Sequence, residues 1–132
     1  MSASIFERKS ISNNEAALLL YENEYFASSI HCFYYSSLQL SISTLIKIFG
    51  YRYEDLGIKA RGKKSSHVFY ISLITDQITD DEVRRKFYDL ATQLKRLRVQ
   101  ADYETLEMRQ FHCNIAKDLN LKIERILKTK LK

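Results

Sequence analysis

The sequence predicts an all-α domain, and three observations support this prediction. The chain of 132 residues contains no proline, and its three glycines all lie between positions 50 and 62. The rest of the chain therefore has almost none of the residues that end helices or form turns. Long segments are rich in Leu, Lys, Glu, Arg and Gln, which lose little rotamer freedom in a helix. Apolar residues also recur at helical spacing, so we expect one domain, residues 1–132, with a single core.

Bulk composition excludes several classes of protein. The chain is 45% apolar and 28% charged, which is typical of a globular domain and not of a disordered segment. The longest apolar region, residues 26–49, contains many serines and Lys47 and is too polar for a membrane span. We find no secretory signal, so we expect a cytoplasmic protein without a membrane partner, in which Cys32 and Cys113 stay reduced. The net charge of +5 permits an acidic partner such as nucleic acid.

The first two helices are predicted from a capping signal and from apolar stripes. Residues Ser12 to Glu15 have the form of a capping box, so the first helix is expected to start there. The second helix, about residues 25–49, has little polar face and should be the central, most buried helix. Its serines are small and would let neighbouring helices come close. Gly50 is a natural C-terminal cap for this helix.

Residues 51–66 are expected to form the one long loop of the domain, because they follow Gly50 and contain the other two glycines. This segment is strongly basic. Its basic residues are Arg52, Lys59, Arg61, Lys63 and Lys64. Ser65 or Ser66 can then cap a short third helix that runs from about residue 67 to residue 77.

Two further helices are predicted from amphipathic spacing. Thr79 to Glu82 forms a second capping box at the start of the fourth helix. The apolar residues of this helix recur at steps of three and four and are Val83, Phe87, Leu90, Leu94, Leu97 and Ala101. The fifth helix, about residues 104–127, repeats the pattern from Met108 to Ile126. Short connections make neighbours antiparallel, so we predict an up-and-down bundle of four main helices plus a short extra helix.

Three segments of the chain together resemble one protein family. The first runs from Glu24-Tyr25-Phe26-Ala27 to Tyr34-Tyr35, the second ends at His67 in Lys-Ser-Ser-His, and the third is Arg98-Val99-Gln100-Ala101-Asp102-Tyr103. These segments are similar to the HEPN superfamily, in a branch with Tyr-Tyr in helix two, a His opening helix three and Arg-x-x-Ala-Asp-Tyr after helix four. The similarity spans nearly the whole chain.

This resemblance implies a HEPN-like helical bundle that forms a homodimer and belongs to a toxin-antitoxin or phage-defence system. Such proteins are often encoded beside a minimal nucleotidyltransferase, which is an expected partner together with RNA or a nucleotide. Several members are metal-independent RNases, so neither a cofactor nor a metal is expected. Those nucleases use an Arg, four to six intervening residues and then a His near the end of the fourth helix, where two subunits meet.

The chain departs from that nuclease pattern. Counting from Arg96, the position of the His is occupied by Ala101, and alanine cannot move a proton. Metal-independent RNA cleavage needs groups that accept and donate protons near neutrality, a task to which His is best suited. One substitute is visible, because Arg61 and His67 are separated by five residues.

The candidate catalytic residues are thus Arg61, His67 and Arg98. Arg61 could hold phosphates together with Lys63 and Lys64, while His67 transfers a proton beside the N-terminus of a helix. The simpler interpretation is a solvated basic loop and a His that helps to cap or pack the third helix. The sequence leaves both interpretations open.

Arg98 and Asp102 are one helical turn apart and can form an ion pair that Tyr103 covers. This set is either a structural signature, worth roughly a few tenths of a kcal/mol, or a part of the catalytic site. In some HEPN toxins the matching Tyr accepts nucleotides from the partner nucleotidyltransferase. The resemblance therefore makes Tyr103 a candidate modification site.

A zinc site is the other chemistry that the sequence raises, because His-Cys occurs at His31-Cys32 and again at His112-Cys113. Adjacent helical residues point about 100° apart, so the two members of each pair cannot easily face one ion. We predict no metal site and expect His112 to be a core histidine.

Two functions follow from these patterns. The first is a HEPN-family component that binds RNA or nucleotide and a partner nucleotidyltransferase, with metal-independent RNase activity through Arg61, His67 and Arg98. The alternative is a catalytically inert dimeric helical module for protein interaction, which the missing family His favours.

Overall fold

The described part of the chain folds into six helices. A computed structural model describes residues 3–61 and 65–131, and all regular structure within these ranges is α-helical. The helices are α1 (Ala3–Glu22), α2 (Phe26–Lys47), α3 (Tyr53–Arg61), α4 (Ser66–Gln77), α5 (Asp81–Tyr103) and α6 (Gln110–Thr129). The predicted all-α bundle is confirmed, with four long helices and two short ones.

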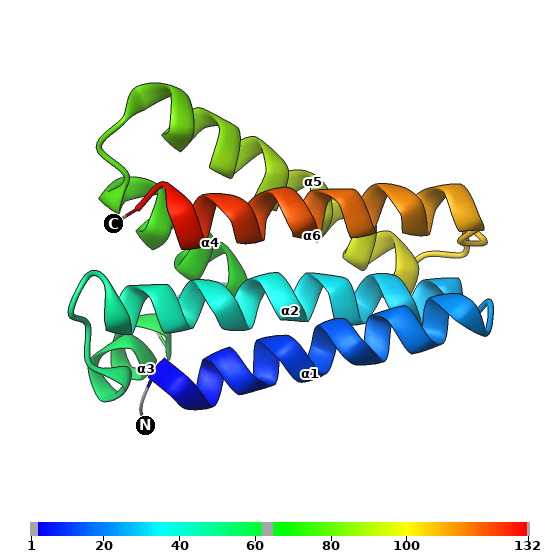
Figure 1. Cartoon of the computed structure of the whole chain (residues 1–132), viewed down its shortest axis with the longest axis horizontal. Helices are drawn as coiled ribbons and strands as arrows, with labels where there is room; N and C mark the ends of the chain where they lie inside the picture. Colours follow the sequence, from blue (N-terminus) through cyan, green and yellow to red (C-terminus); the bar gives the residue numbers. More distant parts are fainter. Residues whose placement is uncertain (1–2, 62–64, 132) are drawn as a thin grey trace.

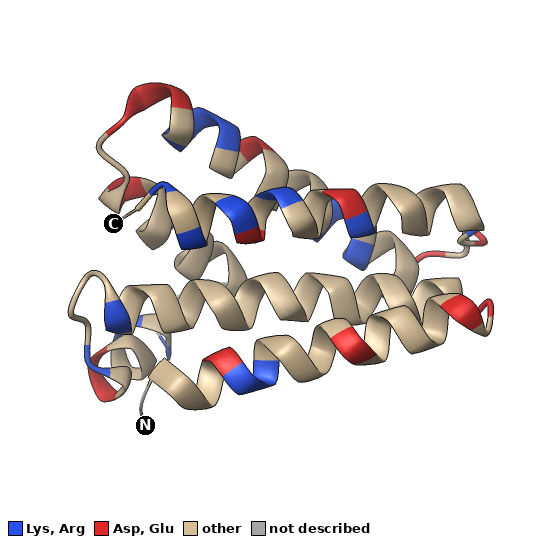
Figure 2. Cartoon of the chain, viewed as in Figure 1, with Lys and Arg blue, Asp and Glu red and all other residues tan. Residues whose placement is uncertain are grey.

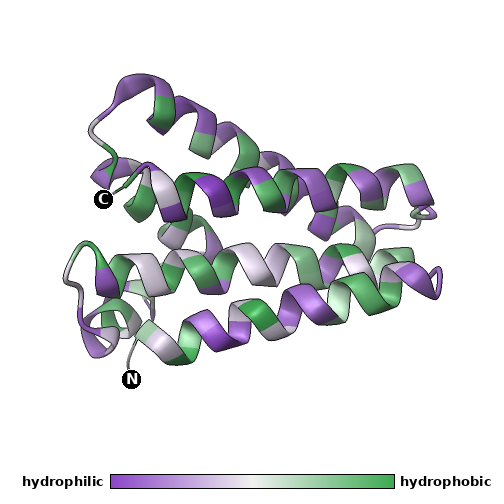
Figure 3. Ribbon diagram, viewed as in Figure 1, coloured by the Kyte–Doolittle hydropathy of each residue, from purple (hydrophilic) through white to green (hydrophobic). Residues whose placement is uncertain are grey.

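Helix α2 is the centre of the bundle, as predicted. It packs against α1, α4, α5 and α6, and Figure 1 shows it running between α1 and α6. Lys47, in its last turn, is the only Lys, Arg, Asp or Glu of α2, so almost the whole helix is tan in Figure 2. Helices α5 and α6 carry both hydrophilic and hydrophobic residues along their length (Figure 3), as is typical of helices with one solvated face.

Helices α1 and α2 are joined by a ladder of serine hydrogen bonds. Three serines of α2, spaced seven residues apart, each donate a hydrogen bond to a backbone carbonyl of α1. The bonds are Ser29 Oγ to Ala17 O at 2.7 Å, Ser36 Oγ to Ser10 O at 2.9 Å and Ser43 Oγ to Ala3 O at 3.1 Å. The acceptors are also seven residues apart, so the ladder follows the heptad repeat of an antiparallel helix pair. It fixes the register of α1 on α2.

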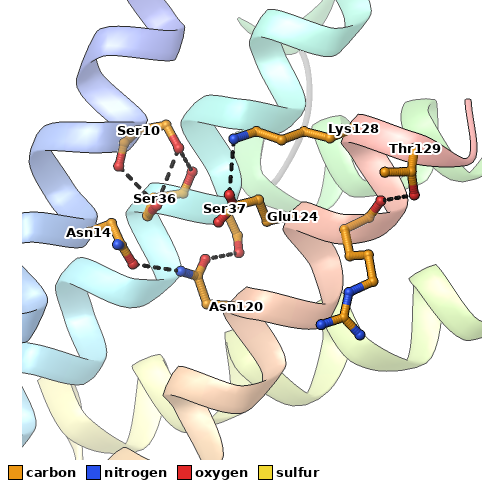
Figure 4. A network of polar contacts seen from close by, with 9 residues as sticks. Ser10, Asn14, Ser36, Ser37, Asn120, Glu124, Lys128 and Thr129 are labelled. Atoms are coloured by element: carbon orange, nitrogen blue, oxygen red, sulfur yellow. Dashed lines mark hydrogen bonds and ion pairs between the residues drawn. The ribbon is translucent and has the colours of Figure 1, made fainter. Parts of the chain in front are cut away.

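A second polar network joins α1, α2 and α6 (Figure 4). The side chain of Asn120 accepts a hydrogen bond from Ser37 Oγ at 2.5 Å and donates one to Asn14 Oδ1 at 3.1 Å. Ser37 and Asn120 are both buried. Because a buried amide without partners is costly, this network favours one arrangement of the three helices.

The predicted start of the first helix is wrong. Helix α1 already includes Ala3, and Ser12 lies exposed in its middle instead of capping its first turn. Phe6, Ser10 and Ala17 are buried against the rest of the bundle. Most helical stability in proteins comes from tertiary packing. Packing on α2 therefore keeps the chain helical on the N-terminal side of the predicted capping box.

The predicted long loop at residues 51–66 is also wrong, because it contains α3. Glu54 and Asp55 lie in the first turn of α3, and Lys59 and Arg61 lie in its last turn. This charge order complements the helix dipole. Leu56, which is fully buried, anchors the helix on the core.

The fifth predicted helix begins later than expected, since α6 starts at Gln110 and not at residue 104. Glu104 and Arg109 both have extended backbone. Met108 is buried although it lies outside the helix, whereas Ile115, placed on the predicted core stripe, is 46% exposed. Leu119, Ile123 and Ile126 of the predicted stripe are buried, so the core face of α6 is the predicted one except at Ile115.

Of the other capping predictions, the one for Ser65 is confirmed, whereas the cap of α5 is Asp80 instead of Thr79 and the C-cap of α2 is Ile48 instead of Gly50. Ser65 caps α4 by accepting a hydrogen bond from Val68 N, and Asp80 caps α5 by accepting one from Val83 N. In residues 3–61 and 65–131, no helix is long and apolar enough to cross a membrane.

Candidate functional site

The candidate site is a cluster of polar and aromatic side chains around Arg98 of α5. We call it the Arg98 cluster. Its members are His31, Tyr34 and Tyr35 from α2, His67 from α4, and Arg98, Asp102 and Tyr103 from α5. It brings together residues from all three segments that the sequence analysis singled out.

Helical spacing places these side chains on facing surfaces. His31, Tyr34 and Tyr35 are related by steps of three and four, so they share one face of α2. Arg98 and Asp102 are likewise one turn apart on α5. His67 is the second residue of α4 and is held there by the Ser65 cap.

A chain of polar contacts runs through the cluster. Arg98 Nη1 donates to Asp102 Oδ2 at 3.4 Å, and Arg98 Nη2 lies 3.1 Å from His67 Nδ1. His31 Nδ1 lies 2.8 Å from the same Asp102 oxygen. The order of groups is thus His31, Asp102, Arg98 and His67.

Aromatic rings enclose the guanidinium of Arg98. Its Cζ lies 5.1 Å from the ring centre of Tyr34, 5.8 Å from that of Tyr35 and 5.6 Å from that of Tyr103. Such positions give cation–π attraction, which is strongest where water is excluded. Tyr34 is 3% exposed and Tyr103 is 75% exposed. One side of the cluster is therefore inside the protein and the other is open to solvent.

Burial and the neighbouring cations lower the pKa of His67. Burial has the larger effect, followed by the positive charges of Arg98 and Lys95. A guanidinium can only donate, so His67 Nδ1 accepts from Arg98 and the proton of the neutral ring is on Nε2. His67 is therefore a neutral hydrogen-bond donor at neutral pH.

The environment keeps Arg98 charged and Tyr34 neutral. Burial acts to lower the pKa of Arg98. The charge interaction with Tyr35, the hydrogen bond to Asp102 and the charge interaction with Tyr34 together raise the pKa by more. Burial raises the pKa of Tyr34, and the opposing effect of Arg98 is smaller. The cluster therefore holds a charged guanidinium, whose charge is paired with the carboxylate of Asp102.

Unpaired polar atoms distinguish this region of the core. In the described residues, Tyr34 Oη and Arg98 Nε are buried without a hydrogen-bond partner, and Gln39 Oε1 is the only other buried side-chain atom in that state. An unpaired buried group costs about 1–3 kcal/mol. Functional sites are a common place for such costs.

The structure places the predicted site residues in three different ways. His67 and Arg98 meet, and the predicted Arg98–Asp102 ion pair under Tyr103 is present. Arg61 is the exposed last residue of α3, and its side chain forms no hydrogen bond or ion pair with another described residue. Lys63 and Lys64 lie outside the described residues.

The sequence analysis missed the role of His31. It considered this residue only with Cys32, as a zinc ligand, although the spacing of His31, Tyr34 and Tyr35 already placed all three on one face. Residues 3–61 and 65–131 contain no group of three or more His, Cys, Asp or Glu side chains arranged to hold a metal ion. Cys32 and Cys113 are unpaired thiols.

His112 is not the core histidine that the sequence analysis expected. It is half-buried, and its Nδ1 accepts a hydrogen bond from Arg109 N at 3.0 Å at the start of α6. The late start of α6 is the reason, because it moves His112 from the middle of a helix into the first turn. The residue acts as a helix cap.

A cleft of about 350 Å³ lies between α1, α2 and α6, away from the Arg98 cluster. Ser10 and Ser36 on its wall are hydrogen-bonded to each other, and Glu124 and Lys128 on its rim form an ion pair (Figure 4). These polar groups are already satisfied within the protein. The cleft therefore offers a ligand less than the Arg98 cluster does.

Comparison of the chain with protein family models, with curated proteins and with solved structures finds no match. The functional conclusion therefore depends on the chemistry of the Arg98 cluster. A guanidinium that contacts one imidazole, is linked through Asp102 to a second and lies under an exposed aromatic ring has the types of group that bind a phosphodiester with an attached base.

Proposed function

We propose that the chain is a HEPN-type component of a toxin-antitoxin or phage-defence system that binds RNA at the Arg98 cluster and cleaves it without a metal. The observation that carries the proposal is the contact of 3.1 Å between Arg98 Nη2 and His67 Nδ1. These residues come from two of the three segments that resemble the family. A guanidinium and an imidazole at this distance can act on the oxygens of the same phosphate group.

We assign a role in RNA binding to three groups of the cluster. Arg98, whose side chain is 8% exposed and bonded to Asp102 and His67, attracts the phosphate through its charge from beneath the open side of the cluster. The Nε2–H of His67 can donate to a second phosphate oxygen. The exposed ring of Tyr103 can stack on a base, and base–aromatic stacking contributes about 1–3 kcal/mol per base.

The proposal also covers a partner protein. Tyr103 is 75% exposed at the end of α5, so a partner nucleotidyltransferase could reach its hydroxyl. Leu106 and Phe111 follow it and are exposed apolar side chains. Exposed apolar side chains in one short segment favour an interface, and we assign them to the homodimer.

A second candidate function is the catalytically inert dimeric interaction module. The observation that favours it is Ala101, which occupies the position of the family His and is partly buried against the core. In that case the Arg98 cluster only fixes the junction of α2, α4 and α5. The RNA cleavage test in the next paragraph distinguishes the two functions.

The test is cleavage of single-stranded RNA by purified protein in excess EDTA. We expect cleavage by the wild type, a loss of at least tenfold in Arg98→Ala, and no change in Arg85→Ala. Arg85 is an exposed cation on the same helix, and its side chain is not part of the Arg98 cluster. Circular dichroism shows whether each variant is folded. No cleavage by any of the folded proteins would favour the interaction module.

A further inference from the structure

We infer that His31, held by Asp102, is the group that accepts the proton in this site and that it acts on the 2′-hydroxyl of bound RNA. The inference rests on the proposed function, because it assigns a role within the same Arg98 cluster. The sequence analysis suggested His67 as the residue that transfers a proton. The present inference gives the proton-accepting role to His31, which lies on a different helix.

The hydrogen bond to Asp102 determines which nitrogen of His31 is free. Asp102 Oδ2 lies 2.8 Å from His31 Nδ1 and also accepts from Arg98 Nη1. A carboxylate can only accept, so in the neutral ring Nδ1 carries the proton and donates it. Nε2 then keeps its lone pair. A carboxylate that orients an imidazole in this way also stabilises the imidazolium that forms after proton uptake.

His67 has the opposite arrangement. Its Nδ1 lone pair accepts from Arg98 Nη2, so its Nε2 carries the proton. Protonation of Nδ1 would turn a hydrogen bond into a contact between two cations. His67 can therefore donate a hydrogen bond to a phosphate oxygen, but it cannot easily accept a proton. The two histidines have complementary roles.

The surroundings of His31 suit a base that meets a substrate. Its side chain is 44% exposed, whereas that of Asp102 is 18% exposed, so solvent and RNA reach the imidazole more easily than its partner. The ring lies 4.6 Å from that of Tyr35 on the same helix, which limits its rotation. Two charged side chains of α5 lie near this ring. Asp102 contacts it directly, and Arg98 contacts Asp102.

The proposed step is an internal transesterification. His31 Nε2 takes the proton of the 2′-hydroxyl, and the 2′ oxygen forms a bond to phosphorus. The bond between phosphorus and the 5′ oxygen breaks, and the leaving oxygen takes a proton from water. The products are a 2′,3′-cyclic phosphate and a 5′-hydroxyl, and His31 returns its proton to solvent. Arg98 and His67 stabilise the charge on the non-bridging oxygens meanwhile.

The first test compares cleavage and RNA binding in His31→Ala and in His112→Asn, both in EDTA. A general base contributes about 100-fold to 10,000-fold in rate, so we expect at least a 100-fold loss of cleavage in His31→Ala with RNA affinity within about threefold of the wild type. Added imidazole should restore part of the rate. His112→Asn, which changes the one histidine outside the cluster, should cleave like the wild type.

The second test reads the tautomers directly. Nitrogen NMR of the folded protein should show His31 protonated on Nδ1 and His67 protonated on Nε2, and Asp102→Asn should disturb His31 while leaving the fold intact. This readout tests the hydrogen bond that leaves Nε2 free, whereas the cleavage rate and its rescue by imidazole test the role in catalysis. A His31 ring protonated on Nε2 alone would overturn the inference, because its lone pair would then face Asp102.

The outcomes separate this inference from the proposed function. Cleavage that Arg98→Ala loses and His31→Ala keeps would reject the role of His31 and leave the RNase function standing. Absence of cleavage by the folded wild type, at any RNA concentration that saturates binding, would reject the RNase function and the role of His31 together. A loss of RNA binding equal to the loss of cleavage in His31→Ala would show a binding residue, which also overturns the inference.

Discussion

His67 Nδ1 lies 3.1 Å from Arg98 Nη2, although the two residues belong to different helices and are 31 positions apart in the chain. The contact requires that α4 and α5 both dock on α2, where Tyr34 packs against both residues. It places a permanent cation beside a neutral imidazole, an arrangement that stabilises an anion. The predictions below follow from this contact and from the packing that supports it.

Arg98→Lys should lower both stability and RNA affinity. A lysine has one compact charge and cannot contact Asp102 and His67 at the same time as a planar guanidinium does. We expect a loss of about 1–3 kcal/mol in the free energy of unfolding, since a partly buried carboxylate loses a partner. Urea unfolding measures this loss. Stability equal to that of the wild type would mean that the contacts of Arg98 contribute nothing to the fold.

The lowered pKa of His67 predicts a stability change with pH. The unfolded chain binds a proton near the ordinary value of 6.5, whereas the folded state resists protonation until a lower pH. The unfolded state therefore binds more protons in the window between the two pKa values, so stability falls as the pH falls through that window. Above the unfolded pKa the contribution of His67 is complete.

This effect is measurable as the difference between the wild type and His67→Gln. We expect the wild type to lose more unfolding free energy than the variant between pH 7.5 and the acid end of the window. The variant has no imidazole at this position, so its remaining pH dependence comes from other groups. Parallel curves for the two proteins would contradict the lowered pKa of His67.

Tyr34→Phe should not destabilise the fold. The hydroxyl of Tyr34 is buried and has no hydrogen-bond partner among the described residues, so its removal relieves a cost of up to about 1–3 kcal/mol. The ring remains and still packs against Arg98. Thermal unfolding should therefore give a Tm equal to or above that of the wild type. A clear decrease in Tm would show that the hydroxyl is paired in solution.

The serine ladder predicts that Ser36 is more sensitive to substitution than serines of α2 outside the ladder. Ser36→Ala removes the hydrogen bond to Ser10 O and should cost about 1 kcal/mol. Ser36→Val, which also enlarges the side chain at the close contact with α1, should cost about 1–3 kcal/mol. Ser28 is exposed on the same helix, so Ser28→Ala is the matched control. Equal stability of the three variants would rule out the ladder as a source of stability.

Apolar spacing was sufficient to predict the fold class and the central position of α2. The local signals were less reliable. The Ser12 capping box lies within α1 because the buried residues Phe6 and Ser10 extend the helix toward the N-terminus. Helix α3 was missed because two glycines suggested a loop, whereas Leu56 and the charge order of its ends stabilise a short helix.

The candidate site was predicted in part. His67, Arg98, Asp102 and Tyr103 were named from the sequence, and the ion pair of Arg98 with Asp102 follows from their spacing alone. The contact of His67 with Arg98 could not be predicted, because it depends on how α4 and α5 dock on α2. His31 was missed for the same reason, since its partner Asp102 is 71 positions away.

The most direct test of the central claim is the binding of fluorescent single-stranded RNA to the wild type, Arg98→Ala and Arg85→Ala, measured by anisotropy in EDTA at several salt concentrations. We predict that wild-type affinity falls as salt rises, because phosphate contacts release counterions. Arg98→Ala should bind at least tenfold more weakly, and Arg85→Ala should bind within about twofold of the wild type. Equal binding by folded wild type and Arg98→Ala would contradict an RNA site at the Arg98 cluster.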